Sequence, residues 1–455
     1  MTIRIRWALG MLLLLLALGA HGEERRPAFD ANYAIEAELY PEARRVVYTE
    51  TAMITNTGTA GTDALYFHIY GNKFKDGNIE VLAVGDGDGN GLEFDREQEG
   101  ILYRVALARE LTPGTSVEVT FDCEVLIPDM EDMYGISAEG DIQLPLFSVQ
   151  LAMYSENGWD TAPIQTNGDG RFAAVADYDL TVRVPEGYAV VCNGNELSRE
   201  TGEGVTAYSY RAENRRDIVL FACEDYAVLE RTVGRTTIKG YFNEKAKGVT
   251  PQAMELAMDS AAFSLEYYRD VFAEYPHDTL VVVSMGNGYA PVGSMEYPGL
   301  VAILFNDGDS DTIKAATYHE VAHQWFYGLV GSDENREPWL DESFAEFAAG
   351  LCLEAGGDDS DPYWNVRDWA AKASAGEKVN VPADAAGDYV NVMYGRGAMF
   401  LKALMDAVGR EDFLAILSRY CREYTYGIAT TEDFLGALYA GTDADVSGIV
   451  AEYIR

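Results

Sequence analysis

The chain has 455 residues, of which 48% are hydrophobic, and it carries a formal net charge of -40 at pH 7. This apolar share is typical of a folded globular protein and excludes a chain that is disordered throughout. Phosphate backbones would repel so acidic a surface, and we therefore expect no nucleic-acid partner. The length allows two or three domains with separate hydrophobic cores.

Residues 1–22 have the pattern of a secretory signal peptide. Arg4 and Arg6 precede an apolar run with five consecutive leucines, and small residues precede Glu23. The run is shorter than the roughly 20 residues of a membrane span. We therefore predict cleavage, no stable membrane insertion afterwards, and a secreted or periplasmic protein; the alternative is a membrane anchor in which the signal stays uncleaved.

Residues 30–227 are predicted to form an N-terminal β domain. Alternating or β-branched runs, such as Ser116 to Phe121 and Tyr178 to Val184, are separated by turn clusters such as Asn56 to Thr59. Many short strands with frequent turns indicate an antiparallel sandwich.

One turn in this domain matches the spacing of a calcium loop. Asp86, Asp88 and Asn90 are followed by Glu97 at the twelfth position. Strand-like runs flank the segment, whereas an EF-hand needs helices, and Glu93 occupies a position that is usually apolar. We favour a glycine-rich hairpin turn, with Ca²⁺ at Asp86–Glu97 as the alternative.

The five cysteines form no CxxC pair, which argues against a cysteine metal cluster. Cys192 and Cys223 lie in strand-like runs, and a disulfide between them is an alternative if export is oxidising. We favour free thiols that pack in the core as small apolar side chains.

Residues 228–455 are predicted to combine a small sheet with helices. A first helix begins after the cap Thr250 and runs to about Phe272, because threonine caps free amides and the next residue is proline. Further on, Thr430 is predicted to cap a late helix. The elements between them are strands at 278–285 and 293–305 and helices at 311–330 and 341–353. The fold class is therefore a multidomain β plus α/β protein that ends in helices.

Two histidines four residues apart, His319 and His323, share one face of the predicted 311–330 helix. Zinc takes two imidazoles and a carboxylate and keeps a fourth position for water. Glu342 supplies the third ligand if its helix packs antiparallel, and Glu346, one turn later, is the competing candidate. Glu320 lies beside the ligands and is predicted to be the general base of a site with one Zn²⁺ per chain. The alternative is a pair of buried structural histidines.

This zinc motif resembles that of the M1 (gluzincin) metallopeptidases, best known as aminopeptidases. Trp325-Phe326 matches residues that surround the motif in that family. Upstream, Gly293-Ser294-Met295-Glu296-Tyr297 is similar to the family's exopeptidase signature, and downstream Tyr394-Gly395-Arg396-Gly397 is similar to the segment with its catalytic tyrosine. The three motifs occur in the family's order, and the resemblance covers roughly residues 31–455.

The resemblance implies a saddle-like β-sandwich followed by a thermolysin-like α+β catalytic domain. It implies that Glu296, with Gly293 and Met295 beside it, binds the free α-amino group of a peptide on an edge strand. It also implies that Tyr394 donates a hydrogen bond to the oxyanion. The expected partners are peptides with a free N-terminus.

The chain also departs from the family pattern. Asp341 and Ser343 replace the usual asparagine and glycine, which puts the fine geometry of the zinc site in question. No β-domain residue is identified that joins Glu296 at the substrate amine. Large family members carry a further helical domain, and its absence before Arg455 leads us to expect a more open cleft.

The leading hypothesis is a secreted zinc-dependent aminopeptidase. Water attacks the scissile carbonyl, Glu320 shuttles the proton, and Tyr394 and zinc stabilise the intermediate. Two alternatives stay open. One is an endopeptidase on the same zinc site with Glu296 structural. The other is a catalytically silent family member that binds peptides or a partner through its β domain.

Overall fold

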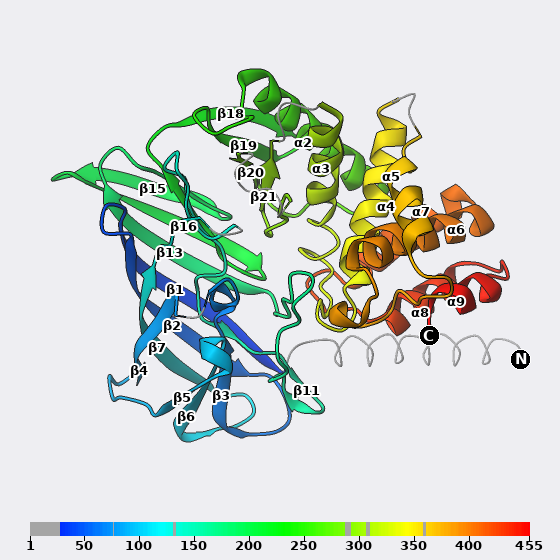
Figure 1. Ribbon diagram of the computed structural model, residues 1–455. Coiled ribbons are helices and arrows are strands. Elements are labelled where there is room, and N and C mark those ends of the chain that lie inside the picture. Colours follow the sequence, from blue (N-terminus) through cyan, green and yellow to red (C-terminus); the bar gives the residue numbers. More distant parts are fainter. Residues whose placement is uncertain (1–27, 76, 131–132, 287–292, 306–309, 358–360) are drawn as a thin grey trace, which may run out of the picture.

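The structure is a computed structural model that describes residues 28–75, 77–130, 133–286, 293–305, 310–357 and 361–455. It has an N-terminal β-sheet domain followed by an α+β domain that ends in helices (Figure 1). The predicted signal peptide at 1–22 lies outside the described residues. Within the described ranges, no helix combines the length and the apolar character that crossing a bilayer requires.

The β domain is built on a seven-stranded sheet with the order β15-β16-β13-β1-β2-β7-β4. Its strands are β1 (Phe29–Tyr40), β2 (Arg45–Asn56), β4 (Ile79–Asp86), β7 (Ser116–Leu126), β13 (Ala176–Pro185), β15 (Asn195–Gly202) and β16 (Val205–Arg215). Buried and exposed residues alternate along β1 and β2, as expected for strands with one face on a core. The sheet is mainly antiparallel as predicted, but β1 and β13 pair in parallel, because a long excursion through the second sheet separates them.

A four-stranded sheet with the order β10-β3-β6-β5 packs on the inner face. Its strands are β3 (Thr62–His68), β5 (Phe94–Glu97), β6 (Leu102–Leu111) and β10 (Gln150–Leu151). Phe67 of β3 meets Phe121 of β7 with ring centroids 4.8 Å apart, so the two sheets share one buried core. Smaller pairings involve β8 (Gly135–Ile136), β9 (Ile142–Leu144), β11 (Tyr154–Ser155), β12 (Gly158–Trp159), β14 (Ala189–Cys192) and β17 (Leu220–Cys223).

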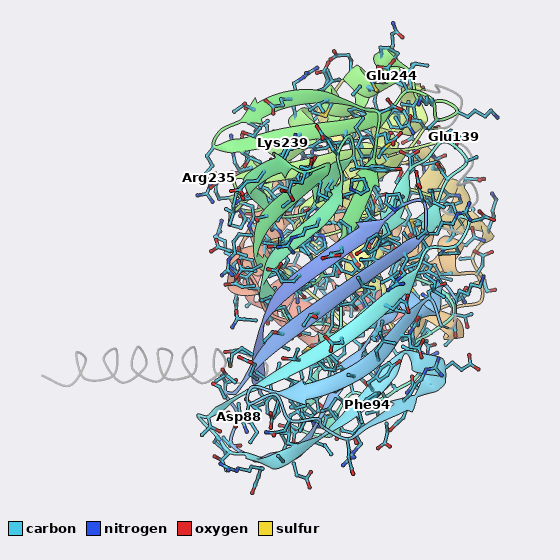
Figure 2. All side chains as sticks on the ribbon, turned by 90° about the vertical axis from the view of Figure 1, so that its left-hand side faces the viewer. Asp88, Phe94, Glu139, Arg235, Lys239 and Glu244 are labelled. Carbon is cyan, nitrogen blue, oxygen red and sulfur yellow. The ribbon has the colours of Figure 1, made fainter. Side chains whose placement is uncertain are left out.

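The calcium-like segment forms a turn between β4 and β5, at the end of the molecule opposite Lys239 and Glu244 (Figure 2). Both flanking elements are strands, so the segment lacks the helices of an EF-hand. The Asp86 carboxylate accepts hydrogen bonds from the backbone amides of Asp88 and Asn90, at 3.0 and 2.8 Å. These bonds explain why aspartate suits the turn without an ion, and the geometry lends the Ca²⁺ alternative no support.

All five cysteines are free and buried, as favoured from the sequence. The disulfide alternative is wrong because β14 and β17 run antiparallel. Cys192 pairs with Leu220, whereas Cys223 pairs with Ala189 at the other end of the ladder. Two cysteines three ladder positions apart cannot bridge without movement of the backbone.

The second domain begins with a four-stranded sheet in the order β18-β19-β20-β21. Its strands are β18 (Tyr226–Val233), β19 (Thr236–Asn243), β20 (Thr279–Met285) and β21 (Leu300–Leu304). Its helices are α2 (Pro251–Val271), α3 (Ser310–Ala322), α4 (Trp339–Ala355), α5 (Trp364–Lys372), a π-helix (Val390–Gly397), α6 (Ala398–Val408), α7 (Arg410–Glu423), α8 (Thr431–Gly441) and α9 (Ser447–Tyr453). Together they surround one large apolar core.

Both predicted helix caps are confirmed. The Thr250 side chain accepts a hydrogen bond from the amide of Ala253 at the start of α2. Thr430 and Asp433 form a reciprocal capping box at the start of α8. Each cap satisfies amides that the first helical turn leaves without an intrahelical partner.

Two predicted elements are shorter than the sequence suggested. The 293–305 strand begins only at Leu300, and Met295 instead makes an antiparallel bridge to Ala302. The 311–330 helix ends at Ala322. It cannot continue through Tyr327, whose φ of 117° lies in a region that non-glycine residues rarely adopt.

Candidate active site

Helices α3 and α4 bring three side chains to one point. The Nε2 atoms of His319, on α3, and of His323, in the turn that directly follows α3, lie 3.0 Å from each other. Glu342 enters from the first turn of α4, and its Oε2 lies 3.4 Å from the His319 Nε2 and 3.5 Å from the His323 Nε2. Helix α3 packs directly on α4, as the predicted antiparallel return requires.

These three atoms fit a zinc ion. Zinc binds imidazole nitrogen and carboxylate oxygen at about 2.0–2.2 Å in a tetrahedron, which places its ligand atoms about 3.3–3.5 Å apart. Both distances to Glu342 match this spacing, and the 3.0 Å between the two nitrogens is slightly shorter. The Glu342 Oε2 is buried and has no hydrogen-bond partner, which is costly unless a cation satisfies it. His319, His323 and Glu342 therefore form a candidate zinc site.

Carboxylates lie behind both histidines, and a hydrogen bond to Asp341 orients the ring of His323. The Oδ1 of Asp341 lies 2.5 Å from the Nδ1 of His323, which is also 3.1 Å from the carbonyl oxygen of Phe326. The Oε2 of Glu346 lies 2.9 Å from the Nδ1 of His319. A proton on each Nδ1 leaves each Nε2 free for the metal. Glu346, the competing third ligand, thus lies on the far side of its histidine from the metal position.

The electrostatics of the site favour bound positive charge. Burial alone lowers the pKa of His319, yet its contacts with Glu342 and Glu346 raise that pKa to about 10. Burial raises the pKa of Glu320 to about 8, against the opposing effect of His319. A dication would take the place of the protons that these buried carboxylates otherwise attract to the imidazoles.

The two predicted catalytic side chains flank the metal position. The Oε2 of Glu320 is buried without a hydrogen-bond partner. The Tyr394 hydroxyl donates to the Oε1 of Glu342 at 2.5 Å, and its ring stacks on His319. Tyr394 belongs to the π-helix, a rare element that is often found at functional sites. The structure therefore brings both side chains to the same site as the three candidate ligands.

Two cavities meet at this point. The first, of about 560 Å³, is lined by residues of both domains, including Phe74, Ile164, Asp169, Met295 and Glu296. The second, of about 570 Å³, is lined by second-domain residues that include Gly293, Ala316, Glu346, Ala349 and Trp369. His319, Glu320 and Tyr394 line both cavities. A chain that crosses from one cavity to the other passes the metal position.

The segment with Glu296 runs antiparallel to the edge strand β21. Met295 exchanges backbone hydrogen bonds with Ala302 at 2.9 and 2.8 Å. Because successive side chains of an extended segment point to opposite faces, Glu296 points to the face opposite Met295. One carboxylate oxygen of Glu296 lies within 4.8 Å of ligand atoms of Glu320 and His323. The position of Glu296 beside the candidate zinc site thus agrees with the role that the resemblance implied.

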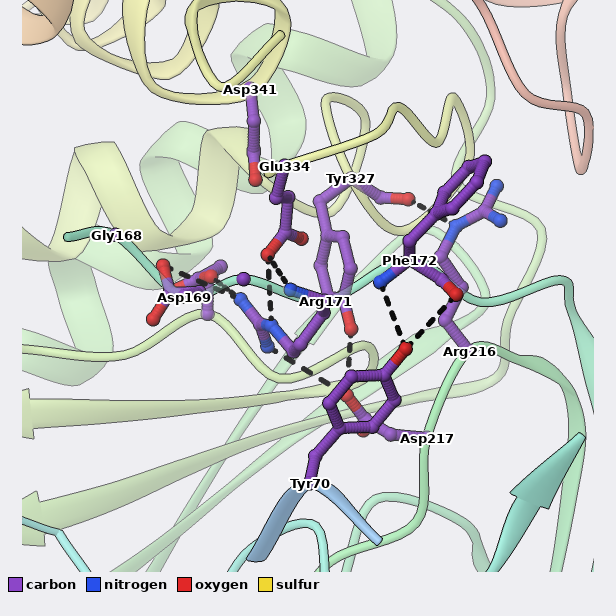
Figure 3. Close-up of polar contacts among 12 residues, drawn as sticks. Tyr70, Gly168, Asp169, Arg171, Phe172, Arg216, Asp217, Tyr327, Glu334 and Asp341 are labelled. Atoms are coloured by element: carbon purple, nitrogen blue, oxygen red, sulfur yellow. Dashed lines mark hydrogen bonds and ion pairs between the residues drawn. The ribbon is translucent and has the colours of Figure 1, made fainter. Parts of the chain in front are cut away.

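Two site residues went unrecognised in the sequence, Asp169 and Arg171 (Figure 3). Asp169 lines the first cavity together with Glu296, and the Arg171 guanidinium forms an ion pair with Glu296. Both lie in an irregular segment between β12 and β13, without periodic spacing. The one signal in the sequence was the pattern Gly168-Asp169-Gly170-Arg171, in which each of two glycines is followed by a charged residue.

The two-domain fold and the candidate His-His-Glu site have the arrangement expected of a zinc metallopeptidase. Residues 256–453 match the family model described as Peptidase family M1 domain. This match lies in the second domain and agrees with the resemblance of the motifs to the M1 family.

Solved structures share the fold of this chain, and curated proteins are similar to it in sequence. The M1 zinc metallopeptidase from Deinococcus radiodurans superposes with a TM-score of 0.70 at 18% identity, over 94% of this chain and 95% of that chain. Aminopeptidase N from Lactococcus lactis subsp. cremoris (strain MG1363) is 24% identical over 93% of this chain and 50% of its own length. Aminopeptidase M1-A from Oryza sativa subsp. japonica is 26% identical over 95% of this chain and 51% of its own. The chain therefore spans about half the length of these relatives.

Proposed function

We propose that this protein is a zinc-dependent aminopeptidase, which removes N-terminal residues from peptides with a free α-amino group. The observation that carries the proposal is that Glu296 and Asp169 line the same cavity as two candidate zinc ligands, His319 and Glu342. Carboxylates at this position attract an α-ammonium group, and the metal position lies within reach of the adjoining carbonyl. The named aminopeptidases among the relatives support the same activity.

His319, His323 and Glu342 would hold the zinc. When bound there, zinc acts as a Lewis acid toward the scissile carbonyl and makes water more nucleophilic at neutral pH. Glu320 accepts a proton from the attacking water and later returns it to the leaving amine. Tyr394 donates a hydrogen bond to the oxyanion as it develops. In the structure its hydroxyl donates to Glu342, and this hydrogen bond has to give way for the hydroxyl to reach the oxyanion.

The two cavities give the peptide a direction. The first, with Glu296 and Asp169, accepts the N-terminal residue, and the second accepts the residues after the scissile bond. A mutant of the M1 zinc metallopeptidase from Deinococcus radiodurans, a protein of the same fold, has been solved with a bound Tyr-Ser-Ala substrate. It supports a short peptide with a free amine as the substrate class.

The test of the proposal is hydrolysis of an aminoacyl-arylamide by the purified protein. Activity should disappear on exhaustive chelation and return with one equivalent of Zn²⁺. Glu320→Gln should keep its zinc and lose at least about 100-fold in kcat, because the general base is gone. Activity that survives complete zinc removal, or an unimpaired Glu320→Gln protein, would overturn the proposal.

The predicted signal at residues 1–22 leads us to propose that the enzyme acts outside the cytoplasm. Expression of the full chain, followed by fractionation and N-terminal sequencing, tests this point. A mature protein that starts near Glu23 in the periplasm or medium is the expected result. Full-length protein in the cytoplasm would contradict it.

A further inference from the structure

Arg171 of the β domain lies among four carboxylates at the edge of the candidate site. Figure 3 shows Arg171 with three of these acids, Asp169, Asp217 and Glu334. Its guanidinium forms an ion pair with Glu296, the carboxylate proposed to bind the substrate amine. The other three acids contact different atoms of the same side chain: Glu334 at 3.3 Å, Asp169 at 3.6 Å and Asp217 at 3.7 Å. The side chain of Arg171 is only 3% exposed, so water screens these contacts little.

The guanidinium is itself held in one orientation. Glu334 accepts hydrogen bonds from the backbone amide and the Nε of Arg171, at 2.9 and 3.3 Å. The ring of Tyr327 lies 4.2 Å from the guanidinium carbon, in a cation–π contact. The Tyr327 hydroxyl in turn donates to Asp217 at 2.7 Å. Because the planar group is fixed by these partners, its contact with Glu296 has a fixed direction too.

The backbone of Tyr327, the residue whose ring contacts Arg171, is also held by hydrogen bonds. Its φ of 117° is strained for a tyrosine. Its backbone amide donates to Val330 at 2.9 Å, and its carbonyl accepts from the Nε of Arg216 at 2.6 Å. The strained residue lies four positions after the ligand His323, so the metal helix and Arg171 belong to one rigid arrangement. Two β-domain arginines thus contact the segment that follows the zinc motif.

Glu296, by contrast, has little else to orient it. It follows Met295, whose backbone is bonded to β21, but its own carboxylate has Arg171 as its one ionic partner among the described residues. Without the guanidinium, the carboxylate would rotate toward water in the cavity. The substrate is placed correctly relative to the metal position only if the carboxylate that binds its α-ammonium group has a fixed position.

We propose that Arg171 is a positioning residue, which holds the Glu296 carboxylate toward the cavity so that the β domain sets the affinity for the peptide α-ammonium group. The inference rests on the proposed aminopeptidase function. It adds that amine recognition depends on a contact across the two domains, between residues 125 positions apart.

The test is a double-mutant cycle on the zinc-loaded full chain, with an aminoacyl-arylamide as substrate. Arg171→Gln should raise KM at least about tenfold while kcat falls less than about threefold and the zinc content stays at the parent level. In a Glu296→Gln background the same substitution should change KM by less than about twofold, because it acts through Glu296. Arg171→Lys, which keeps the charge without the planar fork, should recover part of the affinity.

Arg216 provides a matched control. It is equally buried, but its guanidinium donates to backbone carbonyls of Ala173, Tyr327, Leu329 and Gly427. Arg216→Lys should lower the thermal midpoint and leave KM within about twofold of the parent value. If Arg171→Gln fails to fold, Arg171→Lys carries the same cycle.

Three outcomes overturn the inference. They are an unchanged KM in a folded Arg171 variant, additive effects of the Arg171 and Glu296 substitutions, and an equal rise of KM in Arg216→Lys. These results leave the proposed function intact, because the parent still hydrolyses the substrate. A zinc-loaded parent without aminopeptidase activity would instead overturn the proposed function, and this inference with it.

Discussion

Asp341 is expected to strengthen zinc binding through His323. The two side chains are almost fully buried, with 2% and 1% exposure, and the Oδ1 lies 2.5 Å from the Nδ1. In Asp341→Asn an amide oxygen can still accept this hydrogen bond, but it carries no charge. Hydrogen bonds to charged groups contribute about 1.5–3 kcal/mol and neutral ones about 0.5–1.5 kcal/mol. The difference of about 1–1.5 kcal/mol predicts that Asp341→Asn binds zinc about tenfold more weakly than the parent.

A substitution that removes the hydrogen-bond acceptor altogether separates the orienting role of Asp341 from the effect of its charge. Asp341→Leu removes the acceptor, so the His323 Nδ1 has the Phe326 carbonyl at 3.1 Å as its nearest remaining partner. That carbonyl preserves the tautomer, and we expect zinc affinity to fall by about 100-fold rather than vanish. The matched control is Glu346→Gln behind His319. Its carboxylate is 16% exposed, so water replaces part of the interaction and the loss should be only a few-fold.

The assay is competition for Zn²⁺ against a chelator of known affinity, with kcat measured at saturating zinc. The expected order of affinity is parent, Glu346→Gln, Asp341→Asn and Asp341→Leu, with kcat of Asp341→Asn largely restored by excess zinc. Equal zinc affinity in the parent and both Asp341 variants would refute the reasoning. So would a loss in Glu346→Gln as large as that in Asp341→Asn.

Three further predictions concern other parts of the chain. Tyr394→Phe should lower kcat by about 100–1,000-fold while KM and zinc content stay near the parent values, because it removes an oxyanion donor; an unchanged kcat in steady-state assays would contradict that role. Glu50 is buried in the β domain, and burial raises its pKa from 4.5 to about 8, although the Val149 amide partly opposes this. Because the folded-state pKa is the higher one, the stabilising contribution of Glu50 is fully present below about pH 4.5 and is lost as the pH rises through about 8. Glu50→Gln should therefore gain up to about 5 kcal/mol relative to the parent between pH 4.5 and 9 in urea unfolding, and parallel pH curves would show that Glu50 does not titrate this way. A Cβ at Gly397 would lie 1.8 Å from the Ser343 Oγ, so Gly397→Ala should cost about 1–3 kcal/mol, and a thermal midpoint equal to the parent value would speak against this close approach.

The sequence predicted the parts of the site that depend on short spacings. His319 and His323 lie on one helix face because four residues make about one turn. Glu342 is more distant, and the sequence offered it as a ligand only on the condition that its helix packs antiparallel. The resemblance to the family favoured it over Glu346. The caps Thr250 and Thr430 were predictable for the same reason, since each depends on residues within the first helical turn.

Other features depend on contacts between distant segments. Arg171 meets Glu296 across 125 positions and Glu334 across 163, and no local pattern marks an arginine in a loop as part of a site. The end of α3 depends on the strained backbone at Tyr327, which Arg216 of the other domain helps to hold. Likewise, β21 begins later than predicted because the chain turns back after Met295, which pairs with Ala302. Composition does not reveal such a turn.

The most direct test of the central claim compares one peptide with and without an N-terminal acetyl group. The zinc-loaded protein should hydrolyse the free tripeptide after its first residue, with kcat/KM at least about 100-fold above that for the acetylated form. The reason is that acetylation removes the positive charge that Glu296 and Asp169 would bind. Cleavage of the acetylated peptide at an equal rate would contradict amine recognition and favour an endopeptidase on the same zinc site.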